Sequence, residues 1–209
     1  MPVAGIDGTK DGWVAIVLED GRFAGDFLCR PVESDFGAVA DASVLAIDVP
    51  IGFGPRRADV AARTFLSGAA STVFATPPRE LLEQPFGPGL GVSAQSHALG
   101  PRIFHVTELA RSDPRLHEVH PEVSFRAMNG GLPLAHRKKS AGGALERFAL
   151  LRQHGIELEA LEQVGSAPLD DVLDAAAAAW TAQRLAAGTA GSLPDPPELV
   201  DGSAIAIWY

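Results

Sequence analysis

Acidic residues occur in this chain at positions where the oxygen ligands of a metal ion are expected. Asp7 ends the apolar run VAGID, Asp48 ends VLAID, and Asp174 is the last acid of DDVLDA. Glu118 and Glu122 belong to a further segment, HEVHPEVSF. A carboxylate at the end of a buried strand loses its hydration unless a cation compensates for that loss. Ligand sets made only of oxygen suit magnesium or manganese, so the sequence predicts a site for Mg²⁺ or Mn²⁺.

The acids of the DDVLDA segment open a long alanine-rich helix, expected over residues 169–187. Asp170 and Asp171 fall in its first turn, where the helix dipole alone stabilises a negative charge. Asp174 lies one turn deeper, where that stabilisation fades, and it shares a helix face with Asp171. A carboxylate pair on a buried helix is unfavourable without a cation. We therefore expect Asp171 and Asp174 to be site residues, and Asp174 to be the stronger candidate.

The other acids and the histidine between two of them have alternative structural roles. Asp7 can cap the GTKDG turn, and Asp48 can form a turn before the following proline. Glu118 ends a predicted strand and is better placed to reach a metal than Glu122, which can instead complement the positive end of a helix. His120 can act as an acid or base near neutral pH, or serve as a hydrogen-bonded structural residue.

The periodicity of apolar residues predicts the elements that bring these acids together. An antiparallel meander is expected first, with strands over residues 3–7, 13–19 and 22–28. The later strands are expected over 44–49, 116–119 and 203–208. Helices are expected over 35–42, 57–65, 121–128, 142–154 and 169–187. Between residues 68 and 101, frequent glycine and proline predict long loops broken by short helices.

Hairpin-linked strands followed by alternating helices and strands predict one α/β domain over residues 1–209, with a mixed sheet. A right-handed crossover from the first strand to the strand over 44–49 makes these two strands parallel neighbours. Asp7 and Asp48 then leave adjacent strands at one edge of the sheet, about 5 Å apart. That separation suits metal ions held about 3.5–4 Å from each other.

Basic residues are concentrated in the loop RKKSAGG, which contains Lys138 and Lys139. Such a run is either a solvated surface loop or a place to hold a phosphate group. In the second case we expect a mobile segment that closes over bound substrate and becomes ordered only then. Arg56 and Arg57, after the IGFG turn, are further candidates for substrate binding, with surface ion pairs as the alternative.

The composition limits the choice of partners. The chain has 209 residues, 46% of them hydrophobic, which is enough for a core of its own. Its formal net charge of −9 argues against a protein that coats nucleic acid through a broad basic surface. No apolar run reaches membrane length, no signal-peptide charge pattern precedes the first strand, and the single cysteine, Cys29, permits no internal disulfide. We therefore expect a cytoplasmic protein without membrane contact, with an oligomer left open.

Five ordered motifs resemble one family: GIDGTKDGWV, IDVPIGF, EVHPEVSF, RKKSAGG and DDVLDAAAAAWTA. It is the domain-of-unknown-function family four-two-nine, described as predicted RNase H-like nucleases. The DDVLDAAAAAW run is also similar to the helix of RuvC Holliday-junction resolvases in which two acids three residues apart face the metals. The resemblance implies an RNase H-like fold: a mixed five-stranded sheet of order 3-2-1-4-5, with strand 2 antiparallel, flanked by helices.

The resemblance implies a metal-dependent nuclease or phosphodiesterase that acts on a nucleic acid or nucleotide by two-metal hydrolysis. One metal would activate the attacking water, and the second would stabilise the leaving oxygen. Lys138 or Lys139 would offset the charge of the scissile phosphate. Asp7 would bridge the two metals, and the remaining ligands would be Asp48, Glu118, Asp171 and Asp174.

Two alternatives stay open at this point. GIDGTKDGW also resembles the phosphate-binding hairpin of the sugar-kinase and actin-like ATPase superfamily, whose members close two such domains on ATP. The other alternative is a non-catalytic RNase H-like module that binds a partner. Metal binding by the purified protein separates this last reading from the enzymatic ones.

Overall fold

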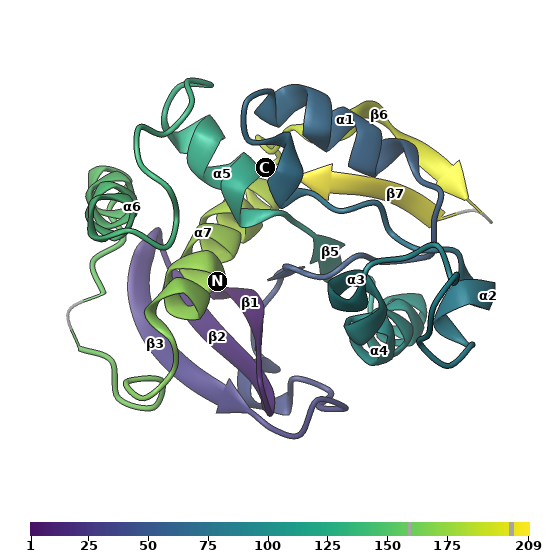
Figure 1. Cartoon of the computed structure of the whole chain (residues 1–209). Coiled ribbons are helices and arrows are strands. Elements are labelled where there is room, and N and C mark those ends of the chain that lie inside the picture. The colour runs from purple at the N-terminus through teal and green to yellow at the C-terminus, as the bar shows by residue number, and fades with distance from the viewer. Residues whose placement is uncertain (159, 201–202) are drawn as a thin grey trace.

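A five-stranded mixed sheet forms the centre of the computed structural model, which describes residues 1–158, 160–200 and 203–209 (Figure 1). The sheet order is β3-β2-β1-β4-β5, antiparallel between β1, β2 and β3 and parallel between β1, β4 and β5. The strands are β1 (Val3–Thr9), β2 (Gly12–Glu19), β3 (Arg22–Cys29), β4 (Leu45–Ile47) and β5 (Leu116–Glu118). The predicted mixed sheet, its strand order and its antiparallel second strand are confirmed.

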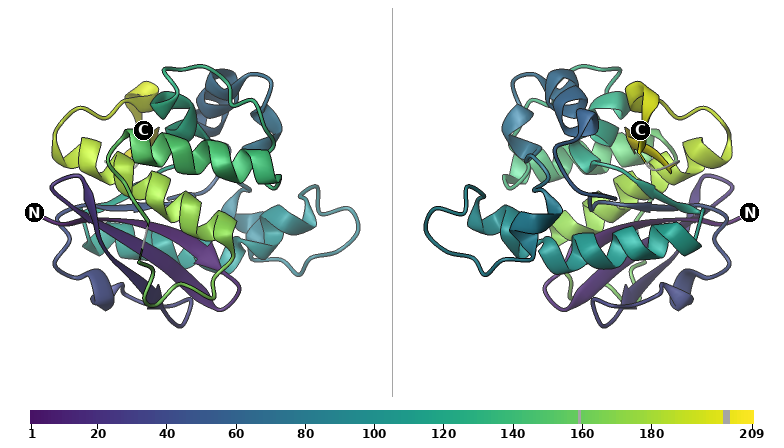
Figure 2. Two further views of the ribbon diagram at one scale, coloured as in Figure 1. Left: turned by 90° about the vertical axis from the view of Figure 1, so that its left-hand side faces the viewer. Right: turned by 90° about the vertical axis from the view of Figure 1, so that its right-hand side faces the viewer.

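Helices cover both faces of this sheet (Figure 2). The yellow-green helix α7 crosses one face together with α6, and the teal helix α4 lies on the opposite face. The helices are α1 (Arg57–Leu66), α2 (Arg79–Leu82), α3 (Ala94–Ala98), α4 (Gly100–Ser112), α5 (Pro121–Met128), α6 (Ala141–Gln153) and α7 (Leu169–Ala186).

The alternation of side chains along β1 assigns its residues to the two faces. Val3 packs into the core cluster that contains the alanines of α7, whereas Ala4 and Ile6 pack into the cluster that contains Ile103 of α4. Asp7 has the same parity as Val3 and therefore faces α7. Because both faces of β1 are buried, its sequence is a nearly continuous run of apolar residues.

Gly5 allows α7 to approach β1 closely. A Cβ atom at Gly5 would overlap the backbone of Ala175 and Ala179, so no other residue fits there without a shift of the helix. Residues 175–179 of the helix are all alanine and fully buried. Small side chains on both elements thus bring the helix backbone directly against the strand. Asp174, next to Ala175, is thereby carried toward the end of the sheet where Asp7 lies.

One further strand was not expected. The strand expected over 203–208 is present as β7 (Ser203–Trp208), but its antiparallel partner β6 (Ser192–Val200) was not predicted. Three prolines interrupt β6, and proline cannot donate to a ladder, so its sequence does not read as a strand. This ribbon lies beside α1, which packs on Ile205 and Ile207 of β7 (Figure 1).

Several predicted boundaries also change. Helix α4 was not anticipated, because the proline-rich stretch before it suggested loops. The helix expected over 35–42 is only a short 3₁₀ turn, Gly37–Val39. β1 continues past Asp7 to Thr9, so Asp7 lies within the strand rather than at its end.

Over the part of the chain that the structure describes, no helix is both long enough and apolar enough to span a membrane.

Replacing Gly5 with Ala should destabilise the protein, because the added methyl group must displace the backbone of α7. We expect a loss of at least about 3 kcal/mol in the free energy of unfolding, at the upper end of overpacking effects. Urea-induced unfolding followed by circular dichroism measures this. The matched control is Gly68→Ala, where a Cβ atom would have no neighbour within 4 Å and the change should be within about 0.5 kcal/mol. Equal stability of the two variants would contradict the close packing.

Candidate metal centre

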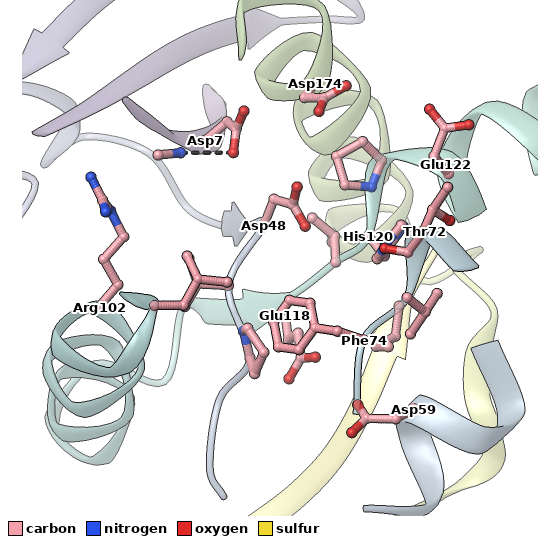
Figure 3. A pocket seen from close by; sticks show the side chains of 18 of the residues that line it. Asp7, Asp48, Asp59, Thr72, Phe74, Arg102, Glu118, His120, Glu122 and Asp174 are labelled. Atoms are coloured by element: carbon pink, nitrogen blue, oxygen red, sulfur yellow. Dashed lines mark hydrogen bonds between the residues drawn. The ribbon is translucent and has the colours of Figure 1, made fainter. Parts of the chain in front are cut away.

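Three carboxylates from separate elements converge at one end of the sheet. Asp7 lies in β1, Asp48 directly follows β4, and Asp174 lies near the start of α7. One ligand oxygen from each lies within 4.8 Å of the others, and the three side chains gather around one space in Figure 3. The prediction that these residues converge is confirmed.

The register of the sheet explains why Asp7 and Asp48 are neighbours. Ile6 pairs with Ile47 across the parallel strands β1 and β4. The Asp48 N–H donates to the Ile6 carbonyl at 3.0 Å and continues this pairing by one step. Ala46 of β4 packs in the core cluster of α7, and Asp48, two residues on, has the same parity. Both carboxylates therefore face the helix that carries Asp174.

One oxygen of this group lacks a partner. Asp174 is only 2% exposed, and its Oδ2 accepts from Lys138 Nζ. Its Oδ1 is buried and, among the described residues, has no hydrogen-bond partner. Asp7 accepts a hydrogen bond from the Gly8 N–H at 2.7 Å. A buried carboxylate oxygen without a partner is rare in native proteins. A cation coordinated by oxygen would satisfy it, so the three residues fit a hard divalent metal.

Burial dominates the electrostatics of the three carboxylates. Burial, followed by repulsion from Asp48 and Asp174, raises the pKa of Asp7 well above its usual range. Burial likewise raises the pKa of Asp48 and of Asp174 to about 7 each, against the lowering effect of Lys138. Carboxyl pKa values that are raised by folding make the metal-free fold less stable as the pH rises from about 4 to about 7. A bound cation would remove that penalty.

Lys138 reaches the site from the loop before α6. Burial alone would lower its pKa, but the ion pair with Asp174 raises it overall. The loop is packed against α6: Ser140 caps the helix through the Gly143 N–H at 3.0 Å, and the Arg137 carbonyl lies directly over Gly143. We expected a mobile segment that orders only with substrate. In the structure Lys138 pairs with Asp174, and the closure of this loop over a bound phosphate stays a prediction.

Glu118 does not join the three carboxylates. It pairs in register with Ile47, which faces α4, and so its carboxylate turns away from Asp48 (Figure 3). The Arg56 guanidinium binds it with two hydrogen bonds, of 2.6 and 2.8 Å, and the Ile51 N–H donates to it at 2.7 Å. Glu118, which we had predicted as a metal ligand, is thus held by hydrogen bonds from Arg56 and Ile51.

Arg56 is likewise engaged, although we had predicted that it binds substrate. It is 6% exposed and forms a second ion pair, with Asp59, besides the pair with Glu118. The adjacent Arg57 is exposed and contributes its backbone N–H to Glu198. The structure does not bring Arg57 into the carboxylate site.

A family described as "Protein of unknown function (DUF429)" matches residues 5–199. The chain belongs to this family. The matched segment contains all three converging carboxylates and Lys138. A search of curated proteins and a search of solved structures each found no match. The DUF429 description names the family but no activity. The proposed chemistry therefore rests on the geometry of the site.

The remaining predicted residues of this DUF429 chain surround the group. Glu122 is held by Arg147, which donates to both of its oxygens at 2.7 Å. Asp171 stays outside the group of three, but its charge contributes to the raised pKa of Asp7. Burial lowers the pKa of His120, whose Nδ1 lacks a partner among the described residues. Its imidazole is therefore neutral at neutral pH.

The carboxylates open into a pocket of about 280 Å³. Its wall also includes Lys138 and apolar residues such as Phe74 and Leu99. Arg102, from the unpredicted helix α4, lines the same pocket and stacks over the Trp13 ring at 5.3 Å. Sequence reasoning missed Arg102 because a single arginine on an unrecognised helix carries no signal. Lys139 is exposed and is not part of this wall.

Replacing Arg56 with Met should destabilise the protein strongly, because Glu118 and Asp59 would remain buried without their common partner. We expect the free energy of unfolding to fall by about 3–5 kcal/mol, as for other broken buried ion pairs. Arg57→Met is the matched control and should change it by less than about 0.5 kcal/mol. Chemical unfolding of both variants gives the comparison. If Arg56→Met is as stable as the parent protein, the arginine is not a structural counter-ion. Arg56 would then again be a candidate for phosphate binding.

Proposed function

We propose that this protein binds Mg²⁺ or Mn²⁺ through Asp7, Asp48 and Asp174 and hydrolyses a phosphodiester bond in a nucleic acid or nucleotide. The observation that carries the proposal is the convergence of three carboxylates within 4.8 Å of one another, one of which, Asp174, has a buried oxygen without a partner among the described residues. Nothing else in the described residues neutralises Asp7 or Asp48 by a direct ion pair.

The arrangement of the site also supports an RNase H-like assignment. The sheet order is that of the RNase H-like fold which the sequence resembles. The acids lie on β1, directly after the neighbouring parallel strand β4, and on a late helix, as the resemblance implies. Fold analogy raises the expectation of nuclease chemistry, and the donor set of the site supports it independently.

The ligand set is complete for one cation and incomplete for two. Three carboxylates can hold one ion, with water or substrate oxygens in the remaining positions. Glu118 would have to leave Arg56 to serve a second ion. Asp171 lies one turn before Asp174 on the same helix and is the better candidate. In our proposal Asp171 therefore takes the place of Glu118 in a two-metal site.

A cation bound there would lower the pKa of a bound water and stabilise negative charge on the phosphate. The protein itself contributes three effects. The ion pairs of Arg56 and Arg147 hold Glu118 and Glu122, so each of these acids has a bound cation beside the site. Lys138 supplies a positive charge next to the carboxylates. The neutral imidazole of His120 lines the same pocket, where it can accept a proton.

Calorimetric titration with Mn²⁺ tests the metal site. The parent protein should bind Mn²⁺, and Asp7→Asn and Asp174→Asn should abolish binding because each removes a charged ligand from the group. Asp41→Asn, which changes an exposed acid, is the control and should bind like the parent. A panel of structured DNA, RNA and dinucleotide substrates with Mn²⁺ then tests hydrolysis, which Asp7→Asn should also abolish. Metal binding without hydrolysis of any of these substrates would contradict the proposed hydrolysis, and absence of metal binding would refute the metal site and favour the non-catalytic module.

The affinity for Mn²⁺ should increase as the pH is raised from about 6 to about 8. Cation binding requires ionised carboxylates, and Asp48 and Asp174 have pKa values of about 7 in the metal-free protein. Protons are therefore released on binding below that pH. Titrations in buffers of different ionisation enthalpy measure this release. A constant affinity with no proton release across this range would contradict the raised pKa values.

A further inference from the structure

Lys138 compensates the charge of Asp174, a role that the proposed metal ion would also have. Its ammonium group pairs with Oδ2 of a carboxylate that is 2% exposed. Lys138 lines the same pocket as all three carboxylates, and its charge lowers the pKa of Asp48 and of Asp7. Only three lysines occur in the chain, Lys10, Lys138 and Lys139, and Lys138 is the one placed here.

The Lys138–Asp174 pair also separates two cavities. Both residues line the carboxylate pocket of about 280 Å³ and a neighbouring cavity of about 480 Å³. The neighbouring cavity is bounded by the first turns of α6 and α7, including Ser140 and Leu173. A side chain that leaves Asp174 therefore has an adjacent space to enter.

The backbone of the loop does not need to move for this. The Ala135 and His136 N–H groups both donate to Glu146, at 2.8 and 3.0 Å, and Ser140 caps α6. The loop is thereby fixed to the helix on both sides of Lys138. The flexible four-carbon stem of a lysine is sufficient to carry the ammonium group from one cavity to the other.

We propose that Lys138 is an internal counter-ion that holds Asp174 in the metal-free protein and is released when a divalent cation binds. This inference rests on the metal site proposed above. Two cations facing the same carboxylates repel each other strongly at short distance in a site of low polarity. The released ammonium is then free to bind a phosphate oxygen of the substrate. Metal loading thus prepares the phosphate-binding group, and substrate binds productively only to the metal-loaded protein.

Lysine labelling of the parent protein tests the release directly. Limited acetylation is followed by mass spectrometry with and without saturating Mn²⁺. Modification of Lys138 should become about tenfold faster with Mn²⁺, the equivalent of removing about 1.4 kcal/mol of protection. Lys10 and Lys139 are exposed and serve as internal controls whose rates should not change. An unchanged rate at Lys138 with Mn²⁺ bound would show that the lysine stays on Oδ2 while the metal uses Oδ1, and would overturn the inference.

The variant Lys138→Met, with Lys139→Met as its matched control, gives an independent measurement. Removing the competing ammonium should tighten Mn²⁺ binding about tenfold, or about 1.4 kcal/mol, whereas Lys139→Met should bind like the parent. Equal or weaker binding by Lys138→Met would overturn the exchange while the parent's affinity leaves the metal site standing. Absence of Mn²⁺ binding in the parent and in Lys138→Met would overturn both proposals. Binding by Lys138→Met alone would overturn the release, because the lysine would then hold Asp174 against the cation in the parent protein.

Discussion

Charge compensation is the constraint on which the rest of this site depends. Three carboxylates that lie within 4.8 Å of one another in a largely buried place repel each other and lose hydration. Two of the surrounding acids are paired with a cation: Glu118 with Arg56, and Glu122 with Arg147. Even so, the charges of Glu118 and Glu122 still contribute to the raised pKa of Asp48. Asp7 and Asp48 have no ion pair among the described residues, and a partner from outside the protein is the simplest remedy.

The packing of α7 on β1 imposes this crowding. Gly5 and the run of buried alanines bring the helix backbone against the strand, so Asp174 cannot withdraw from Asp7 without loss of core packing. The parallel pairing of β1 with β4 fixes Asp48 beside Asp7 in the same way. The carboxylates are thus placed by rigid elements and not by loops. Such placement suits a preorganised metal site, because no large rearrangement has to precede binding.

Much of this arrangement follows from the sequence. Apolar runs and hairpin signals predict the strands, and the crossover rule predicts that Asp7 and Asp48 are neighbours. The position of Glu118 does not follow in the same way. The side of the sheet that Glu118 faces depends on the register of β5 against β4. Its ion pair depends on Arg56, the residue directly before α1, and both are features of the tertiary structure. Strand β6 could not be predicted because prolines interrupt its sequence. Helix α4 could not be predicted because a proline-rich stretch precedes it.

The role of Lys138 is another feature that could not be predicted from the sequence. Its sequence indicates a basic loop that can bind phosphate, and nothing in the sequence shows that it would pair with Asp174. Only the folded chain shows that the cation and the acid are partners across 36 residues. The loop is therefore part of the carboxylate site itself. In our proposal, one side chain links metal binding to substrate binding.

The most direct measurement of the central claim is anomalous diffraction from crystals of the parent protein soaked in Mn²⁺. Our account predicts a manganese peak between Asp7, Asp48 and Asp174, with carboxylate oxygens at about 2.1–2.2 Å, close to the distances of octahedral oxygen sites. The same experiment on Asp7→Asn crystals should show no peak there. A fully soaked parent crystal with no manganese at this position, or with manganese held only by other residues, would contradict the account.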